Sequence, residues 1–77
     1  MDERKRIVND LRLALMYVDS ARVEMSEVIR DMCDEFDKHE ESKVATLDIT
    51  IANQTYKHLE AIYETLIAMF TELQARE

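Results

Sequence analysis

Apolar residues in the first half of the chain recur with helical spacing. From Ile7 to Met32 they step by four and three residues without a break, the pattern of an apolar stripe kept over several heptads. The members of this stripe are Ile7, Leu11, Ala14, Val18, Ala21, Met25, Val28 and Met32. A flanking row widens it and contains Val8, Leu15, Arg22, Ile29 and Phe36. A stripe of this width is typical of a bundle helix, which we predict over about residues 3–38.

The second half of the chain repeats this design. Residues seven apart form the rows Ala52, Leu59, Leu66, Leu73 and Thr55, Ile62, Met69, with the flanking row Ile49, Tyr56, Tyr63, Phe70. Residues 46–51 alternate between polar and apolar as a strand would. Because a lone strand without a partner is unstable, we predict a helix over about residues 44–76.

Between the two patterns, residues 37–43 form the longest stretch without an apolar side chain. The chain has no glycine and no proline, the residues on which tight turns most depend. We therefore predict one all-α domain over residues 1–77, with a turn at about 39–43 and two helices folded into an antiparallel hairpin. Asp2 and Ser42 are the expected N-caps. In this hairpin, residue i lies opposite roughly residue 82 − i.

Both predicted helices carry more apolar surface than one hairpin can cover. Residues 11–18 and 66–70 are apolar nearly all the way round, and the hairpin brings them to the same level, away from the turn. A helix that is apolar on all faces is normally buried. We expect a second hairpin to cover this region in a coiled-coil-like four-helix bundle, or a helix of another protein to dock there. The predicted partner or oligomer interface consists of Leu13, Met16, Tyr17, Tyr63, Ile67 and Phe70.

Charge is distributed unevenly along the chain. The net charge is −7, and residues 24–41 hold eight acidic side chains against Arg30 and Lys38. The candidate acidic patch in this segment consists of Glu27, Asp31, Asp34, Glu35 and Asp37. It is either a solvated face or a binding surface for a basic protein. An acidic chain is repelled by phosphate backbones, which argues against direct nucleic-acid binding.

The length and the single cysteine limit how the chain is stabilised and where it works. Its 77 residues form at most a small core, and Cys33 is the only cysteine, so no internal disulfide supports that core. A lone thiol favours a reducing compartment. No apolar run approaches the roughly 18 residues that span a bilayer, and no signal-peptide pattern follows the charged N-terminus. We therefore expect a soluble cytoplasmic protein that does not enter a membrane.

Residues with catalytic or metal-binding potential are few. His39 and His58 lack the glutamate three positions earlier that a di-iron bundle site needs. Without glycine, no glycine-rich phosphate loop can form. Cys33, Asp37 and His39 form only a loose candidate metal cluster, with no second ligand pair spaced to match. We predict no enzyme activity, no metal, no cofactor and no small-molecule substrate.

These features favour a non-enzymatic protein–protein interaction module. Such an adaptor, co-chaperone or regulator would act through helix packing, on itself as a homodimer or on another helical protein. In architecture the predicted hairpin resembles the small helical-hairpin chaperones and adaptors of bacterial secretion systems, and small bundle-forming regulators. The alternative is an acidic inhibitor or nucleic-acid mimic that blocks a basic protein surface through residues 24–41.

Overall fold

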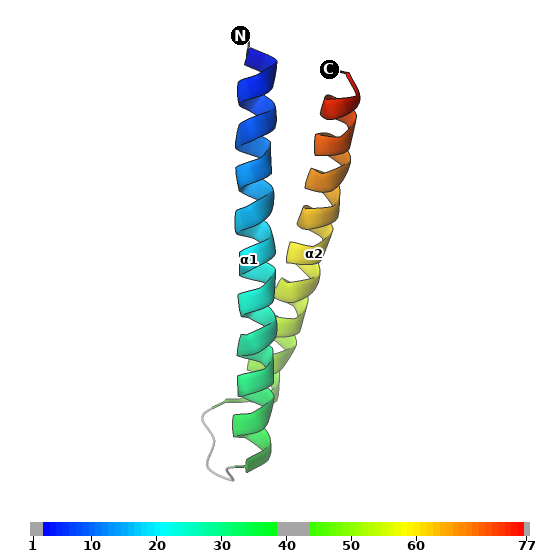
Figure 1. The fold of residues 1–77 in the computed structure, drawn as a ribbon. Helices are drawn as coiled ribbons and strands as arrows, with labels where there is room; N and C mark the ends of the chain where they lie inside the picture. Colours follow the sequence, from blue (N-terminus) through cyan, green and yellow to red (C-terminus); the bar gives the residue numbers. More distant parts are fainter. Residues whose placement is uncertain (1–2, 39–43, 77) are drawn as a thin grey trace.

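Two long antiparallel helices make up the described part of the protein. The computed structural model describes residues 3–38 and 44–76, and within them helix α1 spans Glu3–Lys38 and helix α2 spans Thr46–Ala75. The start of α1 and the end of α2 lie at the same end of the molecule (Figure 1). The molecule measures 59 × 16 × 12 Å. The described ranges contain no strand. The predicted all-α hairpin is confirmed, and the predicted turn at 39–43 lies outside the described residues.

Helix α2 begins at Thr46, two residues later than the sequence pattern predicts. Ala45 is extended, and the Asp48 carboxylate accepts a hydrogen bond of 2.9 Å from the Ala45 backbone N–H. This is half of a capping box, because alanine has no side-chain acceptor to complete it. The alternating segment 46–51 is helical, as predicted. The expected caps Asp2 and Ser42 lie outside the described residues.

The seam between the helices is formed by two rows of side chains from each helix. In α1 the seam residues are Val8, Leu11, Leu15, Val18, Arg22, Met25, Ile29 and Met32. In α2 they are Ile49, Ala52, Tyr56, Leu59, Tyr63, Leu66, Phe70 and Leu73. The row predicted to flank the main stripe of α1 is therefore an inner row, whereas Ile7, Ala21 and Val28 are exposed. One helix–helix contact has room for two rows, so the third apolar row of each helix is left at its edge.

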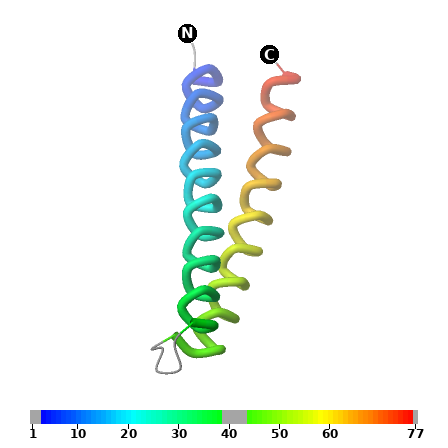
Figure 2. The backbone as a smooth tube through the Cα atoms, turned by 60° about the horizontal axis from the view of Figure 1, so that its bottom comes forward, coloured from blue at the N-terminus to red at the C-terminus, as the bar shows by residue number. Residues whose placement is uncertain are grey.

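Three contacts between the ends of long side chains and the opposite helix define the register. The Arg4 guanidinium donates a hydrogen bond of 2.6 Å to the Arg76 carbonyl oxygen. The Arg12 guanidinium lies 5.7 Å from the centre of the Phe70 ring, and that of Arg22 lies 4.7 Å from the centre of the Tyr63 ring. These pairs agree with the predicted register. The two helices are inclined to one another: they lie close together at the end of α1 and the start of α2, and farther apart at their other ends (Figure 2).

The core of a single hairpin is small. Among the described residues only Val8 and Ala52 are buried, with 4% and 3% of their surface exposed. Every other seam residue keeps part of its surface in contact with solvent. Two helices can shield one another on one face only, so the seam side chains are covered from one direction and open at both edges.

Candidate interaction surface

The six residues predicted as a partner interface lie in three different places. Tyr63 and Phe70 belong to the seam, where their rings are covered by Arg22 and Arg12. Leu13, Met16 and Tyr17 are exposed, and their helical positions place them on the outer face of α1, opposite the seam. Ile67 lies at one edge of α2 and is exposed. The structure therefore does not gather the six residues into one surface.

A different set of apolar residues shares one long side of the hairpin. In α1 the residues directly before the seam row that begins at Val8 lie at the edge of the contact, and so do the residues directly before the α2 seam row that begins at Ile49. In an antiparallel pair these two edge rows fall on the same side of the seam. We call this surface the apolar side; its residues are Ile7, Ala14, Ala21 and Val28 of α1 and Asp48, Thr55, Ile62 and Met69 of α2. All four of its large side chains are exposed: Ile7, Val28, Ile62 and Met69. The heptad pattern contains these residues, but it does not by itself place them at the edge of the seam.

Two shallow hollows lie along α2 at the apolar side. One has a volume of about 220 Å³ and is lined by Ala61, Ile62, Thr65 and Leu66. The other has a volume of about 200 Å³ and is lined by Met69, Glu72, Leu73 and Arg76. Each hollow lies between successive turns of one helix, where a side chain from a facing helix inserts in knobs-into-holes packing.

The opposite edge of the seam is polar. We call it the polar side; its residues are Arg12, Asp19, Ser26 and Cys33 of α1 and Asn53, Glu60, Ile67 and Gln74 of α2. Ile67 is the only large aliphatic side chain in this set. The two sides therefore flank the same seam with different chemistry.

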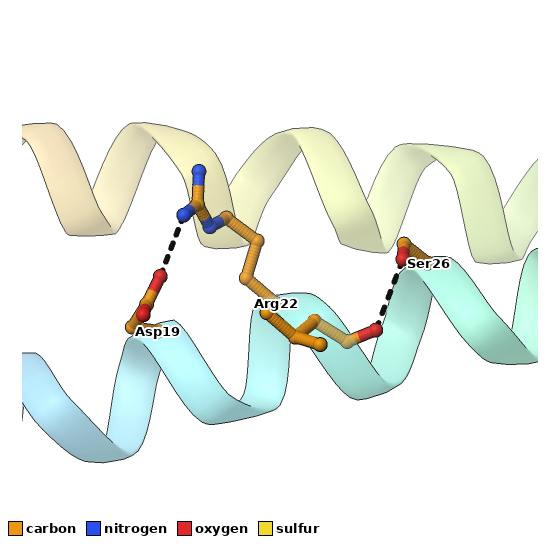
Figure 3. Close-up of polar contacts among 4 residues, drawn as sticks. Asp19, Arg22 and Ser26 are labelled. Atoms are coloured by element: carbon orange, nitrogen blue, oxygen red, sulfur yellow. Dashed lines mark hydrogen bonds and ion pairs between the residues drawn. The ribbon is translucent and has the colours of Figure 1, made fainter.

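Arg22 is the one charged residue in the seam rows of the described helices. Its side chain reaches from α1 toward α2, and Asp19 of the preceding turn accepts a hydrogen bond from its guanidinium (Figure 3). This bond raises the pKa of Arg22 above its ordinary value, although partial desolvation acts in the opposite direction. The guanidinium also covers the Tyr63 ring, a cation–π arrangement. Arg22 therefore lies across the seam by burying its aliphatic stem and keeping its charge paired.

The candidate acidic patch lies on exposed parts of α1 near the connection. Its five members are all exposed. Asp34 forms an ion pair of 3.2 Å with Lys38, and Asp31 lies 3.8 Å from the Arg30 guanidinium. Such exposed pairs contribute little to stability. With Arg30 and Lys38 counted, the five acidic side chains leave a net charge of −3. Arg30, Cys33 and three of the aspartates also line an open hollow of about 460 Å³.

Other kinds of site find little support in the described parts of the chain. Residues 3–38 and 44–76 bring no three His, Cys, Asp or Glu side chains together in a group that could hold a metal ion. In the same residues, neither helix has an apolar stretch long enough to cross a membrane. The fold and the surface thus define a two-helix antiparallel hairpin with one unpaired apolar side. No protein-family model, curated protein or solved structure matches the chain.

Proposed function

We propose that this protein is a non-enzymatic protein–protein interaction module that acts through helix–helix packing. Its role is that of an adaptor, co-chaperone or regulator in the cytoplasm. The observation that carries the proposal is the contrast between two buried side chains and twelve large exposed apolar ones in the described residues. A protein surface that covers the exposed side chains completes the core that one hairpin lacks.

The energetics of a small core support this proposal. Full burial of a large apolar side chain contributes roughly 1.5–3 kcal/mol, and most seam residues here are only partly buried. Ordering each residue costs about as much in conformational entropy, so chains of this size depend on additional stabilisation. Packing against another protein supplies it without a disulfide or a metal.

Thermal unfolding followed by circular dichroism tests the proposed function. A hairpin that needs a second protein surface unfolds at a temperature that rises over about a hundredfold range of its own concentration. If the partner is a different protein, it is first identified by cross-linking in the native host. The midpoint temperature of unfolding is then expected to rise when that helical protein is added. A monomer that unfolds cooperatively at the same temperature at every concentration, with or without that protein, would contradict the proposal.

The exposed acidic patch favours a second candidate function, the blocking of a basic protein surface. Glu27, Asp31 and Asp34 lie on the side of α1 that faces away from α2. Reversal of Asp31, Asp34 and Asp37 to lysine is expected to abolish such binding and to leave the helix content unchanged. A complex whose affinity does not fall as ionic strength increases would rule out this candidate.

A further inference from the structure

We propose that the apolar side is covered by a second copy of this chain, with the two hairpins packed in opposite directions. The connection of each hairpin then lies beside the chain termini of the other, and the assembly is a four-helix bundle. This inference rests on the proposed function and names its partner. Three features of the hairpin carry it: the area of the face, its alternation of large and small side chains, and the charge of its two ends.

The face is large enough for a stable dimer. The hairpin is 59 Å long and 16 Å wide, so one broad face presents roughly 900 Å² where a standard protein–protein interface needs about 800 Å² from each partner. A single docked helix would cover only part of this width. A second hairpin has the same width and covers all of it.

The apolar side combines small and large residues at the same level. Ala14 of α1 lies level with Met69 of α2, and Ala21 lies level with Ile62, because the register pairs positions that sum to about 82. Small side chains next to large ones leave room for the large side chains of a facing copy. The two hollows along α2 provide further room at Ile62 and Met69. A face of this kind can pack against itself around a two-fold axis.

The charges of the two ends decide the relative direction. We call residues 1–12 and 70–77 the terminal end; they hold five basic and five acidic side chains, a net charge of zero. We call residues 24–58 the turn end; they hold nine acidic and four basic side chains, a net charge of −5. Opposite packing places each negative end beside a neutral one. Packing in the same direction would bring two negative ends together, which opposes association.

A matched pair of substitutions tests which side is covered. Ile62 and Ile67 are both in α2 and similarly exposed, at 48% and 40%, but they lie on the apolar side and the polar side respectively. Sedimentation equilibrium is expected to show a dimer for the unmodified chain and for Ile67→Lys. Ile62→Lys is expected to weaken the dimer at least a hundredfold. Because both variants place the same residue in the same helix, a loss of helicity confined to Ile62→Lys also supports the inference.

The native cysteine tests the direction of packing without any substitution. Cys33 lies on the polar side near the turn end, so a spin label on its sulfur stays outside the proposed interface. An electron–electron double resonance measurement on the labelled dimer is expected to give roughly 40–45 Å, since the labels are offset by about 36 Å along the bundle and about 20–25 Å across it. Packing in the same direction removes the offset along the bundle, so a distance of about 20–25 Å would overturn the proposed orientation.

Failure of this inference can be distinguished from failure of the proposed function. A dimer that survives Ile62→Lys but is lost in Ile67→Lys overturns the inference, because another side is covered, and leaves the function standing. A chain that stays monomeric and gains stability only from a different helical protein has the same consequence. A stable monomer with no partner contradicts both.

Discussion

The two long sides of the hairpin flank the same seam, yet their composition is very different. The apolar side presents Ile7, Val28, Ile62 and Met69, whereas the polar side carries charged and amide side chains around Ile67. Both sides lie one position from a seam row, and both are open to solvent in a single hairpin. The needs of the hairpin alone do not account for the difference. The proposed self-association accounts for it, because it covers the apolar side and leaves the polar side open.

Polar substitution of the apolar side is expected to have the largest effect on self-association. Replacement of Ile7, Val28, Ile62 and Met69 by glutamine leaves every seam residue in place, so the hairpin keeps its own contacts. We expect self-association to weaken by more than about a thousandfold, because four large side chains per chain no longer become buried. We also expect a loss of helical circular dichroism at micromolar concentration, since the remaining core is too small to hold the helices. Sedimentation and circular dichroism at matched concentrations measure both effects.

The same number of glutamines on the outer face provides the control. Replacement of Leu13, Met16, Tyr17 and Leu47, which are all exposed and lie away from the seam, is expected to change association by less than about tenfold. An equal loss in the two quadruple variants would show that the apolar side has no special role.

Reversing two charges tests whether the terminal end lies beside the turn end of the other copy. Arg4→Glu together with Arg6→Glu changes the net charge of the terminal end from zero to −4. With opposite packing this end faces the negative turn end of the other copy, so we expect at least about tenfold weaker association at low salt. High salt should remove most of this loss. Analytical ultracentrifugation at two ionic strengths is the measurement.

Charge reversal at the other end gives different results for the two arrangements. Asp34→Lys together with Asp37→Lys brings the net charge of the turn end from −5 to −1. Opposite packing predicts little change in association, because the terminal end that this end faces is neutral. Packing in the same direction predicts stronger association, because a repulsion between two negative ends is lost. Stronger association of this variant would therefore count against the proposed orientation.

Much of the fold follows from the sequence pattern. The unbroken steps of three and four residues predicted the bounds of α1, and the absence of glycine and proline limited the chain to few turns. The register is also predictable, because the position of the connection sets it. The start of α2 is not, since it depends on the Asp48 carboxylate reaching back to the Ala45 N–H. Hydrophobic periodicity carries no information about such a bond.

The surface was harder to predict, for a physical reason. Each helix has three apolar rows, and periodicity alone does not say which two enter the seam. Arg22 shows the difficulty: a charged residue occupies an inner row because its guanidinium lies over the Tyr63 ring while Asp19 pairs with its charge. Once the seam rows are known, the antiparallel direction brings the remaining rows, Ile7 to Val28 and Thr55 to Met69, onto one side. The prediction of Leu13, Met16 and Tyr17 rested on the many apolar residues in this part of α1. It did not consider on which side of the hairpin each residue lies.

The smallest expected effect comes from Thr55, the uncharged polar member of the apolar side. Thr55 lies level with Val28, and its hydroxyl donates a hydrogen bond of 2.9 Å to the Ile51 carbonyl oxygen of its own helix. Thr55→Val replaces this hydroxyl by a methyl group of similar size, so burial against a second copy becomes more favourable. We expect association to strengthen about three- to tenfold, measured by sedimentation equilibrium, since the change occurs twice in a symmetric dimer.

Thr50→Val is the matched control for this gain. Thr50 makes the same kind of hydrogen bond, to the Thr46 carbonyl oxygen at 3.0 Å, but it lies on the outer face of α2. Threonine and valine have similar helix propensities, so neither variant changes the helix itself appreciably. If the apolar side is the buried one, only Thr55→Val strengthens association. An equal gain in both variants would mean that added hydrophobicity promotes association anywhere on α2, and the difference between the two sides would then carry no structural meaning.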